Sequence, residues 1–102
     1  MNIIIRETAL ESLSKLHFNE SEGIRIVTNQ EKSCTLFVDY QLTIDQHTED
    51  DEIIVSDGIP FIISSDTKNI LPEKIYISYN GIYGYKLSSD EQILKANIDL
   101  KK

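Results

Sequence analysis

The stretch Leu36-Phe37-Val38-Asp39-Tyr40-Gln41-Leu42-Thr43-Ile44-Asp45 carries the clearest structural signal in this sequence. Apolar residues recur at every second position from Leu36 to Ile44, and mostly polar residues lie between them. Side chains of a β-strand point alternately to its two faces, so this period predicts a long strand with one buried and one wet face. Earlier in the chain, Gly23 introduces Ile24–Thr28, whose alternation predicts another strand.

Turn residues extend the strand pattern toward the C-terminus. Asp57-Gly58 separates Ile53–Val55 from Ile59–Ile63, and an Asp-Gly pair between apolar runs is a strong signal for a β-hairpin. Pro60 has no backbone N–H to donate, so we expect its strand to lie at a sheet edge or to begin at that residue. A second hairpin is predicted around Asn80-Gly81, between Ile75–Tyr79 and Tyr83–Leu87.

Two helices are expected. Thr8-Ala9-Leu10-Glu11 has the T-x-x-E pattern of a capping box, which predicts a helix that begins there and ends near His17. Its buried face would consist of apolar residues at three- and four-residue spacing: Ala9, Leu10, Leu13 and Leu16. Ser64–Thr67 supplies cap residues for a short second helix through Leu71, and Pro72 would end it.

The two ends of the chain complete the predicted fold. A β-branched run at Ile3–Ile5 predicts an N-terminal strand. The tail fits two structures, because Asp90 could cap a helix that carries Ile93 and Leu94, whereas Ile98 fits a strand equally well. We therefore predict one α+β domain over residues 1–102, with two helices and mostly antiparallel strands around a small sandwich-like core.

Composition and charge argue against several classes of partner. Among 102 residues, 40% are hydrophobic, yet no apolar run approaches the roughly 20 residues that cross a bilayer. The N-terminus lacks a basic stretch followed by a long apolar segment, so we expect no secretory signal. A formal net charge of −7 would repel phosphate backbones, and no cluster of Lys and Arg suits anionic lipid. Neither nucleic acid nor a membrane is therefore expected as a partner.

Cys34 is the single cysteine, and any thiol or metal chemistry would depend on it. A disulfide within one chain needs two thiols, and an iron–sulfur cluster normally needs about four thiolates. A lone thiol also fits the reducing cytoplasm, where we expect this protein. Two hypotheses stay open. Two copies of Cys34 in a dimer could bind iron or a labile cluster, completed by carboxylates, His or an external thiol, or Cys34 could be an ordinary buried side chain.

Other candidate residues are expected to have structural roles. His17 and His47 do not form a ligand-spaced pair, so we expect a helix-end and a solvated loop position for them. Thr48–Glu52 lacks the ligand pattern of a calcium loop and reads as a solvated acidic turn. Cys34, His47 and Asp45 have no orienting motif, so we expect no enzyme. Four tyrosines could line a pocket or simply pack across strands: Tyr76, Tyr79, Tyr83 and Tyr85.

The order of several short motifs resembles the HesB/IscA-like family, which comprises the iron–sulfur biogenesis or A-type carrier domains. The resemblance runs from about Ile3 to about Asp90 and does not extend through the tail, residues 91–102. The motifs that carry it are Gly23-Ile24-Arg25-Ile26, Cys34, Asp57-Gly58-Ile59, the short helical segment ending in Leu71, and Gly84-Tyr85-Lys86-Leu87.

This resemblance implies a HesB-like fold and a role in iron–sulfur cluster biosynthesis, as a homodimer and with iron–sulfur assembly proteins as partners. Cluster-carrying members typically have a Gly-Gly-Cys-Ser-Gly-like turn and a Cys-Gly-Cys pair near the C-terminus. Here the turn reads Lys32-Ser33-Cys34-Thr35-Leu36 and no cysteine follows Leu87, so Cys34 matches only the first ligand position. A degenerate member of this kind would either bind iron or a cluster weakly through Cys34 or act as an interaction module without metal.

Overall fold

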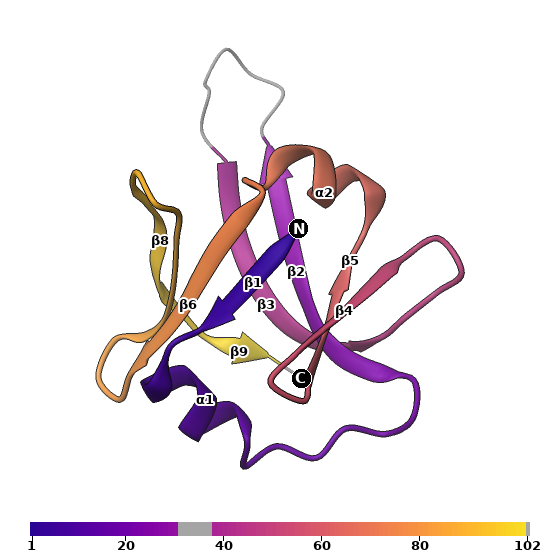
Figure 1. Cartoon of the computed structure of the whole chain (residues 1–102), viewed down its shortest axis with the longest axis horizontal. Helices are drawn as coiled ribbons and strands as arrows, with labels where there is room; N and C mark the ends of the chain where they lie inside the picture. The colour runs from indigo at the N-terminus through magenta and orange to yellow at the C-terminus, as the bar shows by residue number, and fades with distance from the viewer. Residues whose placement is uncertain (31–37, 102) are drawn as a thin grey trace.

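Two β-sheets enclose the core of the protein. A computed structural model describes residues 1–30 and 38–101, and Figure 1 shows the two sheets on either side of the core, with a helix at each end. One sheet has the strand order β1-β6-β7-β8 and the other β4-β5-β2-β3-β9. The elements are β1 (Asn2–Ile5), α1 (Glu7–Leu13), β2 (Glu22–Gln30), β3 (Val38–Gln46), β4 (Glu52–Ser56), β5 (Ile59–Ile63), α2 (Ser65–Ile70), β6 (Lys74–Asn80), β7 (Gly84–Ser88), β8 (Ile93–Ile98) and β9 (Leu100–Lys101). The predicted α+β class is confirmed.

The longest ladder joins β2 to β3. It is antiparallel and runs from the pair Glu22–Gln46 to the pair Gln30–Val38. Tyr40 and Leu42 are buried, so the alternation does mark an inward face. Leu36 and Phe37, with which the predicted strand began, lie outside the described residues.

Parallel pairing is more frequent than expected. β1 pairs with β6, β2 with β5, and β3 with β9, each in parallel. The hairpins are antiparallel because a short turn can join only antiparallel neighbours, whereas these three pairings unite strands that are distant in the sequence. Local turn signals could therefore not reveal them, and the sheets are mixed.

The hairpin of β4 and β5 forms as predicted. Asp57 and Gly58 both have positive φ, 49° and 81°, as the preferred two-residue hairpin turns require. β5 lies between β4 and β2, so placing it at a sheet edge was wrong. The alternative is confirmed, because Pro60 is the second residue of β5 and so lies near its start.

The capping box predicted for the first helix does not form. Arg6 occupies the N-cap of α1 without a side-chain hydrogen bond, and α1 ends at Leu13 instead of near His17. The Thr8 hydroxyl oxygen instead accepts a hydrogen bond from the backbone N–H of Tyr79, at 3.2 Å. A tertiary contact with β6 has thus replaced the local cap.

The second helix follows the local prediction. The Ser64 hydroxyl oxygen accepts from the backbone N–H of Thr67, at 3.2 Å, and caps α2. Within residues 1–30 and 38–101, the helices are too short and too polar to cross a membrane.

The tail is β-structure, so the helical alternative for it was wrong. β8 pairs with β7, and β9 adds to the other sheet beside β3. Ile98 at the end of β8 is buried and belongs to the hydrophobic core. The tail therefore helps to close the core, which a solvent-facing helix could not do.

The acidic turn is less solvated than predicted, because Asp51 forms a bidentate ion pair with Arg25 on β2. The Arg25 Nη1 and Nη2 atoms lie 3.0 and 2.7 Å from the two Asp51 carboxylate oxygens, and Arg25 Nε lies 2.8 Å from Asp45 Oδ2. The Asp51 side chain is only 5% exposed. The turn is thus fixed to the sheet by a charge pair that solvent screens poorly.

Arg25 holds the pKa of Asp51 well below its usual range, chiefly through its hydrogen bonds. A carboxyl group with a lower pKa in the folded than in the unfolded chain contributes stability above the unfolded pKa, about 4. That contribution is lost as the pH falls through the folded pKa.

We predict that Asp51→Asn lowers the free energy of unfolding by about 2–4 kcal/mol at pH 7, because Arg25 then loses its buried partner. The difference from wild type should shrink steadily below about pH 4. Urea unfolding across this pH range measures both effects. Asp50→Asn, which removes a neighbouring exposed charge, should change stability little at any pH; an equal loss in both variants would contradict this role of Asp51.

Gly84 is required by the close approach of β7 and β8. Its φ is 90°, and a Cβ there would lie 2.7 Å from the backbone oxygen of Ile98. We predict that Gly84→Ala destabilises the fold by about 2–4 kcal/mol, since backbone must move to relieve both the clash and the strain. Thermal unfolding should show no comparable change for Gly81→Ala, where the added Cβ meets nothing within 4 Å.

Candidate functional site

The site predicted from the sequence centres on Cys34, which lies outside the described residues. The structure describes the residues on either side of that segment, where Gln30 of β2 pairs with Val38 of β3. This end of the ladder is at the top of Figure 1, beside α2. The described groups at this end are hydroxyl groups of β2 and α2 and an ion pair between β3 and β8.

A chain of hydroxyl groups fixes α2 to this end of β2. The hydroxyl oxygens of Thr28 and Thr67 lie 3.1 Å apart, and the Ser64 hydroxyl donates to that of Thr67 at the same distance. Thr67 is the buried polar residue of the described core, only 4% exposed. Because each hydroxyl has a partner, these groups stabilise the junction between α2 and β2.

Asp39 is the first acid that follows Cys34 in the sequence. Lys95 of β8 donates a hydrogen bond to Asp39 Oδ1, and Gln41 Nε2 lies 3.5 Å from Oδ2. The pKa of Asp39 is lowered, chiefly by the hydrogen bond from Lys95. Asp39 is therefore ionised but paired, and it would have to leave Lys95 to bind a metal ion.

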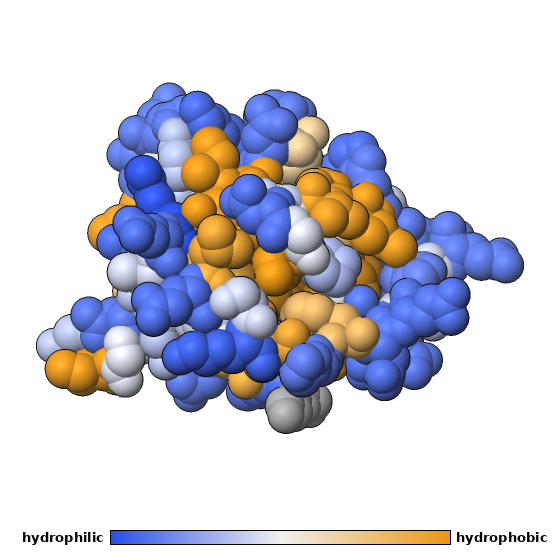
Figure 2. All heavy atoms as spheres, turned by 60° about the horizontal axis from the view of Figure 1, so that its bottom comes forward, coloured by the Kyte–Doolittle hydropathy of each residue, from blue (hydrophilic) through white to orange (hydrophobic). Residues whose placement is uncertain are grey.

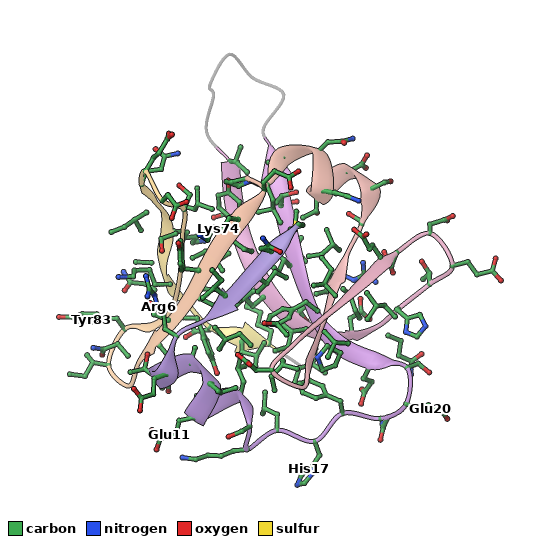
Figure 3. All side chains as sticks on the ribbon, viewed as in Figure 1. Arg6, Glu11, His17, Glu20, Lys74 and Tyr83 are labelled. Atoms are coloured by element: carbon green, nitrogen blue, oxygen red, sulfur yellow. The ribbon has the colours of Figure 1, made fainter. Side chains whose placement is uncertain are left out.

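The histidines are not brought to this end. His17 is exposed at the bottom of Figure 3. Because α1 ends at Leu13, His17 does not belong to the last turn of the helix, where it was expected. His47 follows the opposite end of β3, about 27 Å along the ladder from the Gln30–Val38 pair at 3.3–3.4 Å per residue. Its Nδ1 atom lies 3.0 Å from the backbone oxygen of Ser21.

No catalytic pairing of His47 and Asp45 is seen in the described residues, because the Asp45 carboxylate binds Arg25. The described residues also contain no group of three or more His, Cys, Asp or Glu side chains that could hold a metal ion.

The four tyrosines occupy different positions on β6, on β7 and in the turn between them. The rings of Tyr79 and Tyr85 pack 4.6 Å apart on the inward face, and the Tyr85 hydroxyl lies 2.7 Å from that of Ser12. Burial raises the pKa of Tyr85. Tyr76 of β6 faces outward, whereas Tyr83 lies in the turn between β6 and β7 and is 64% exposed. Both predicted roles therefore occur, packing for the inward pair and pocket lining for Tyr83.

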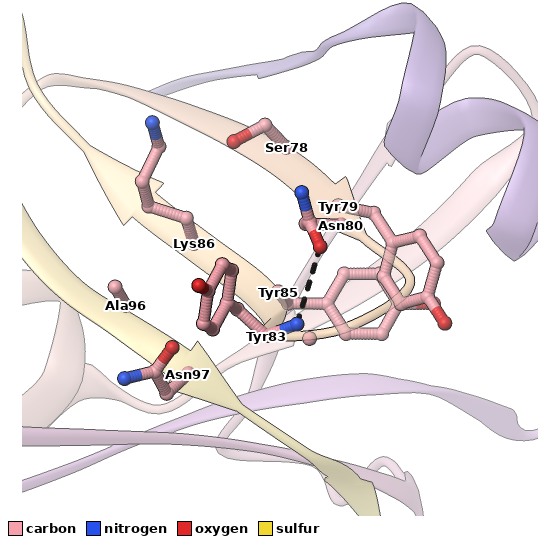
Figure 4. A pocket seen from close by; sticks show the side chains of 9 residues that line it. Ser78, Tyr79, Asn80, Tyr83, Tyr85, Lys86, Ala96 and Asn97 are labelled. Atoms are coloured by element: carbon pink, nitrogen blue, oxygen red, sulfur yellow. Dashed lines mark hydrogen bonds between the residues drawn. The ribbon is translucent and has the colours of Figure 1, made fainter.

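A hollow of about 300 Å³ lies on the outward side of the β6–β7 hairpin. Figure 4 shows the Tyr83 ring among Lys86, Ala96 and Asn97, whereas the rings of Tyr79 and Tyr85 turn away. No single motif in the sequence marks this hollow, since its lining comes from three strands and a turn. The available signal for it was that the polar residues Ser78 and Asn80 are two positions apart on β6 and therefore face the same side of the strand.

A larger hollow of about 470 Å³ lies between the chain segment after α1 and the β4–β5 hairpin. Its lining includes the apolar residues Leu16, Phe18, Ile53, Val55 and Ile62. Figure 2 shows this end of the molecule, where hydrophobic surface lies centrally within a hydrophilic rim. Nothing in the described residues marks this hollow as a site for a particular ligand.

The fold is shared with two crystal structures of proteins proposed to act in Fe–S biosynthesis. The protein from Lactobacillus acidophilus is 18% identical, with a TM-score of 0.66 over 100% of this chain and 90% of the other. The protein from Lactobacillus salivarius, described as having a novel fold, is 16% identical, with a TM-score of 0.68 over 99% of this chain and 97% of the other. At this level of identity the likeness establishes the fold alone.

A comparison with curated proteins finds no match. The model of the family described as "iron-sulphur cluster biosynthesis" matches residues 1–102, which includes the tail that the resemblance in the sequence did not cover. The chain therefore belongs to the iron–sulphur cluster biosynthesis family.

Proposed function

We propose that the protein assists iron–sulfur cluster biosynthesis by binding iron or a labile cluster as cargo between two chains, through the thiolates of their Cys34 residues. The family match over the whole chain carries this proposal. The thiolate is the form of cysteine that binds iron, and Cys34 is the one thiol in the sequence.

The number of ligands requires more than one chain. A cluster normally takes about four protein ligands, so two copies of Cys34 would supply about half of the shell. Carboxylates, His or an external thiol would have to supply the rest. Asp39 is a poor donor because Lys95 already holds it, and His47 lies at the far end of the ladder. An external thiol is therefore the best-supported source of the missing ligands.

Weak binding suits a protein that hands cargo on. A shell completed by exchangeable thiols can lose its cargo to an acceptor with more thiolates, because thiolates compete directly for iron. We accordingly propose iron–sulfur assembly proteins as its partners, and a homodimer as the form that holds the cargo.

Anaerobic reconstitution with iron, sulfide and glutathione tests this proposal. We predict a visible charge-transfer absorption band, iron and sulfide that co-elute with a dimer, and loss of both band and metal in Cys34→Ser. Absorption spectra, metal analysis and size-exclusion chromatography measure these outcomes. Thermal unfolding of Cys34→Ser in parallel shows whether the fold persists, and a packing role alone would cost about 1–2 kcal/mol.

His17→Gln and His47→Gln serve as controls, because both residues lie away from the Gln30–Val38 end of β2 and β3. They should leave the absorption band unchanged. A wild-type protein that stays colourless and free of metal would refute the cargo proposal. It would leave the alternative, an interaction module that keeps the fold without cluster ligands.

A further inference from the structure

The outward face of the sheet β1-β6-β7-β8 gathers positive charge in a protein of formal net charge −7. Ile75 and Ile77 of β6 are fully buried, so alternation turns Lys74 and Tyr76 to the outside. Lys86 of β7 pairs with Ser78 and lies on the same face. Figure 3 shows Lys74 and Arg6 on this side of the molecule, with Tyr83 at its lower end.

The cations of this face lack close ion pairs. Within the described residues Arg6, Lys74 and Lys86 form no salt bridge, unlike Arg25, Lys68 and Lys95. The Arg6 guanidinium carbon lies 4.5 Å from the centre of the Tyr76 ring, and Lys74 Nζ lies 5.5 Å from it. The cation–π contacts hold these two side chains over the sheet and leave the Arg6 donors available to a partner.

Acids do gather near Lys74, because Glu73, Asp90 and Glu91 line a hollow together with it. The Tyr76 hydroxyl donates to Asp90 Oδ1 at 2.5 Å, so Asp90 stands at the edge near Lys74. Lys86 lies farther along β7, next to the 300 Å³ hollow. The positive charge that these acids do not offset is therefore greatest toward Arg6 and Lys86.

The hollow beside Lys86 is lined by hydrogen-bond donors. The Asn80 carboxamide oxygen accepts from the backbone N–H groups of Ile82 and Tyr83, at 2.8 and 3.2 Å. Its amide NH₂ is therefore left to donate elsewhere. The hydroxyl of Ser78 and the amide of Asn97 also lie at the hollow, and among the described residues no acid lines it. A carboxylate, which only accepts hydrogen bonds, matches such a set of donors.

We propose that this outward face docks an acidic segment of a partner protein, with one carboxylate side chain in the hollow beside Lys86 and Asn80 and a further acid on Arg6. Nucleic acid fits less well, because the rest of the chain is strongly acidic and would repel a phosphate backbone. A second copy of this chain also fits less well as the partner. Its acidic surface would contact a different surface of the first copy, and such head-to-tail contacts produce open chains of molecules unless they close into a ring.

The interaction is expected to be weak and to depend on salt, since the cations are accessible to solvent. It does not involve Cys34, so it is independent of the proposed cargo binding. The same titration in Cys34→Ser would separate the two proposals, because the docking face should persist when the thiol is removed.

NMR titration of the ¹⁵N-labelled full chain with the peptide hexaglutamate, at low salt, tests the docking face. We predict shift changes concentrated on residues 74–86 and 93–97. Lys86→Glu and Arg6→Glu should each weaken binding about three- to tenfold, consistent with the loss of one exposed charge contact and added repulsion. Lys15→Glu is the matched control, because Lys15 is exposed beyond α1 and its substitution changes the net charge equally.

Three results would overturn the proposal. They are an absence of shift changes on the sheet, equal weakening by Lys15→Glu, and tighter binding of hexathymidylate than of hexaglutamate at the same residues. Dispersed spectra and an unchanged thermal midpoint check that each variant folds. Should Lys86→Glu fail this check, Lys86→Gln replaces it, with about two- to threefold weaker binding expected.

Discussion

The pairing of β2 with both β3 and β5 is the constraint on which the other elements depend. β2 is antiparallel to β3 along its whole length and parallel to β5 at Ile24 and Arg25. From this central strand Arg25 fixes the acidic turn before β4, and Thr28 contacts α2. A strand bonded on both edges cannot shift by one residue without turning its buried side chains outward. β2 therefore sets the register of this sheet.

Charge is distributed unevenly over this frame. Arg25 of the five-stranded sheet holds Asp45 and Asp51, whereas the outward face of the other sheet carries Arg6 and Lys86, which form no salt bridge within the described residues. The net charge of the chain does not reveal this difference between the two sheets, because it sums the charges of the whole protein. Lys95 of β8 and Asp39 of β3 connect the two sheets. The proposed docking face thus belongs to the sheet β1-β6-β7-β8. Through Lys95 and Asp39 this sheet is connected to β3, the strand that follows Cys34 in the sequence.

The predictions that succeeded relied on neighbours in the sequence. Asp57-Gly58 forms the expected turn because the turn needs positive φ at both residues, which few other residue pairs adopt readily. Ser64 caps α2 by accepting a hydrogen bond from Thr67, three residues later in the sequence. Thr8 failed as a cap because a backbone N–H of β6, 71 residues away, took its hydroxyl oxygen. Asp51 failed as a solvated acid for the same reason, since Arg25 lies 26 residues away. The candidate Cys34 remains a prediction, because it lies outside the described residues.

By itself the sequence determined the strand alternation, both hairpin turns, the short second helix and the resemblance to a family of iron–sulfur biogenesis proteins. These depend on periodicity and on backbone preferences that act over a few residues. Only the tertiary structure decided the parallel pairings, the strand conformation of the tail, the partner of Asp51 and the cationic face with its hollow. Each of these joins residues that are far apart along the chain, and their contacts depend on how two sheets pack around one core.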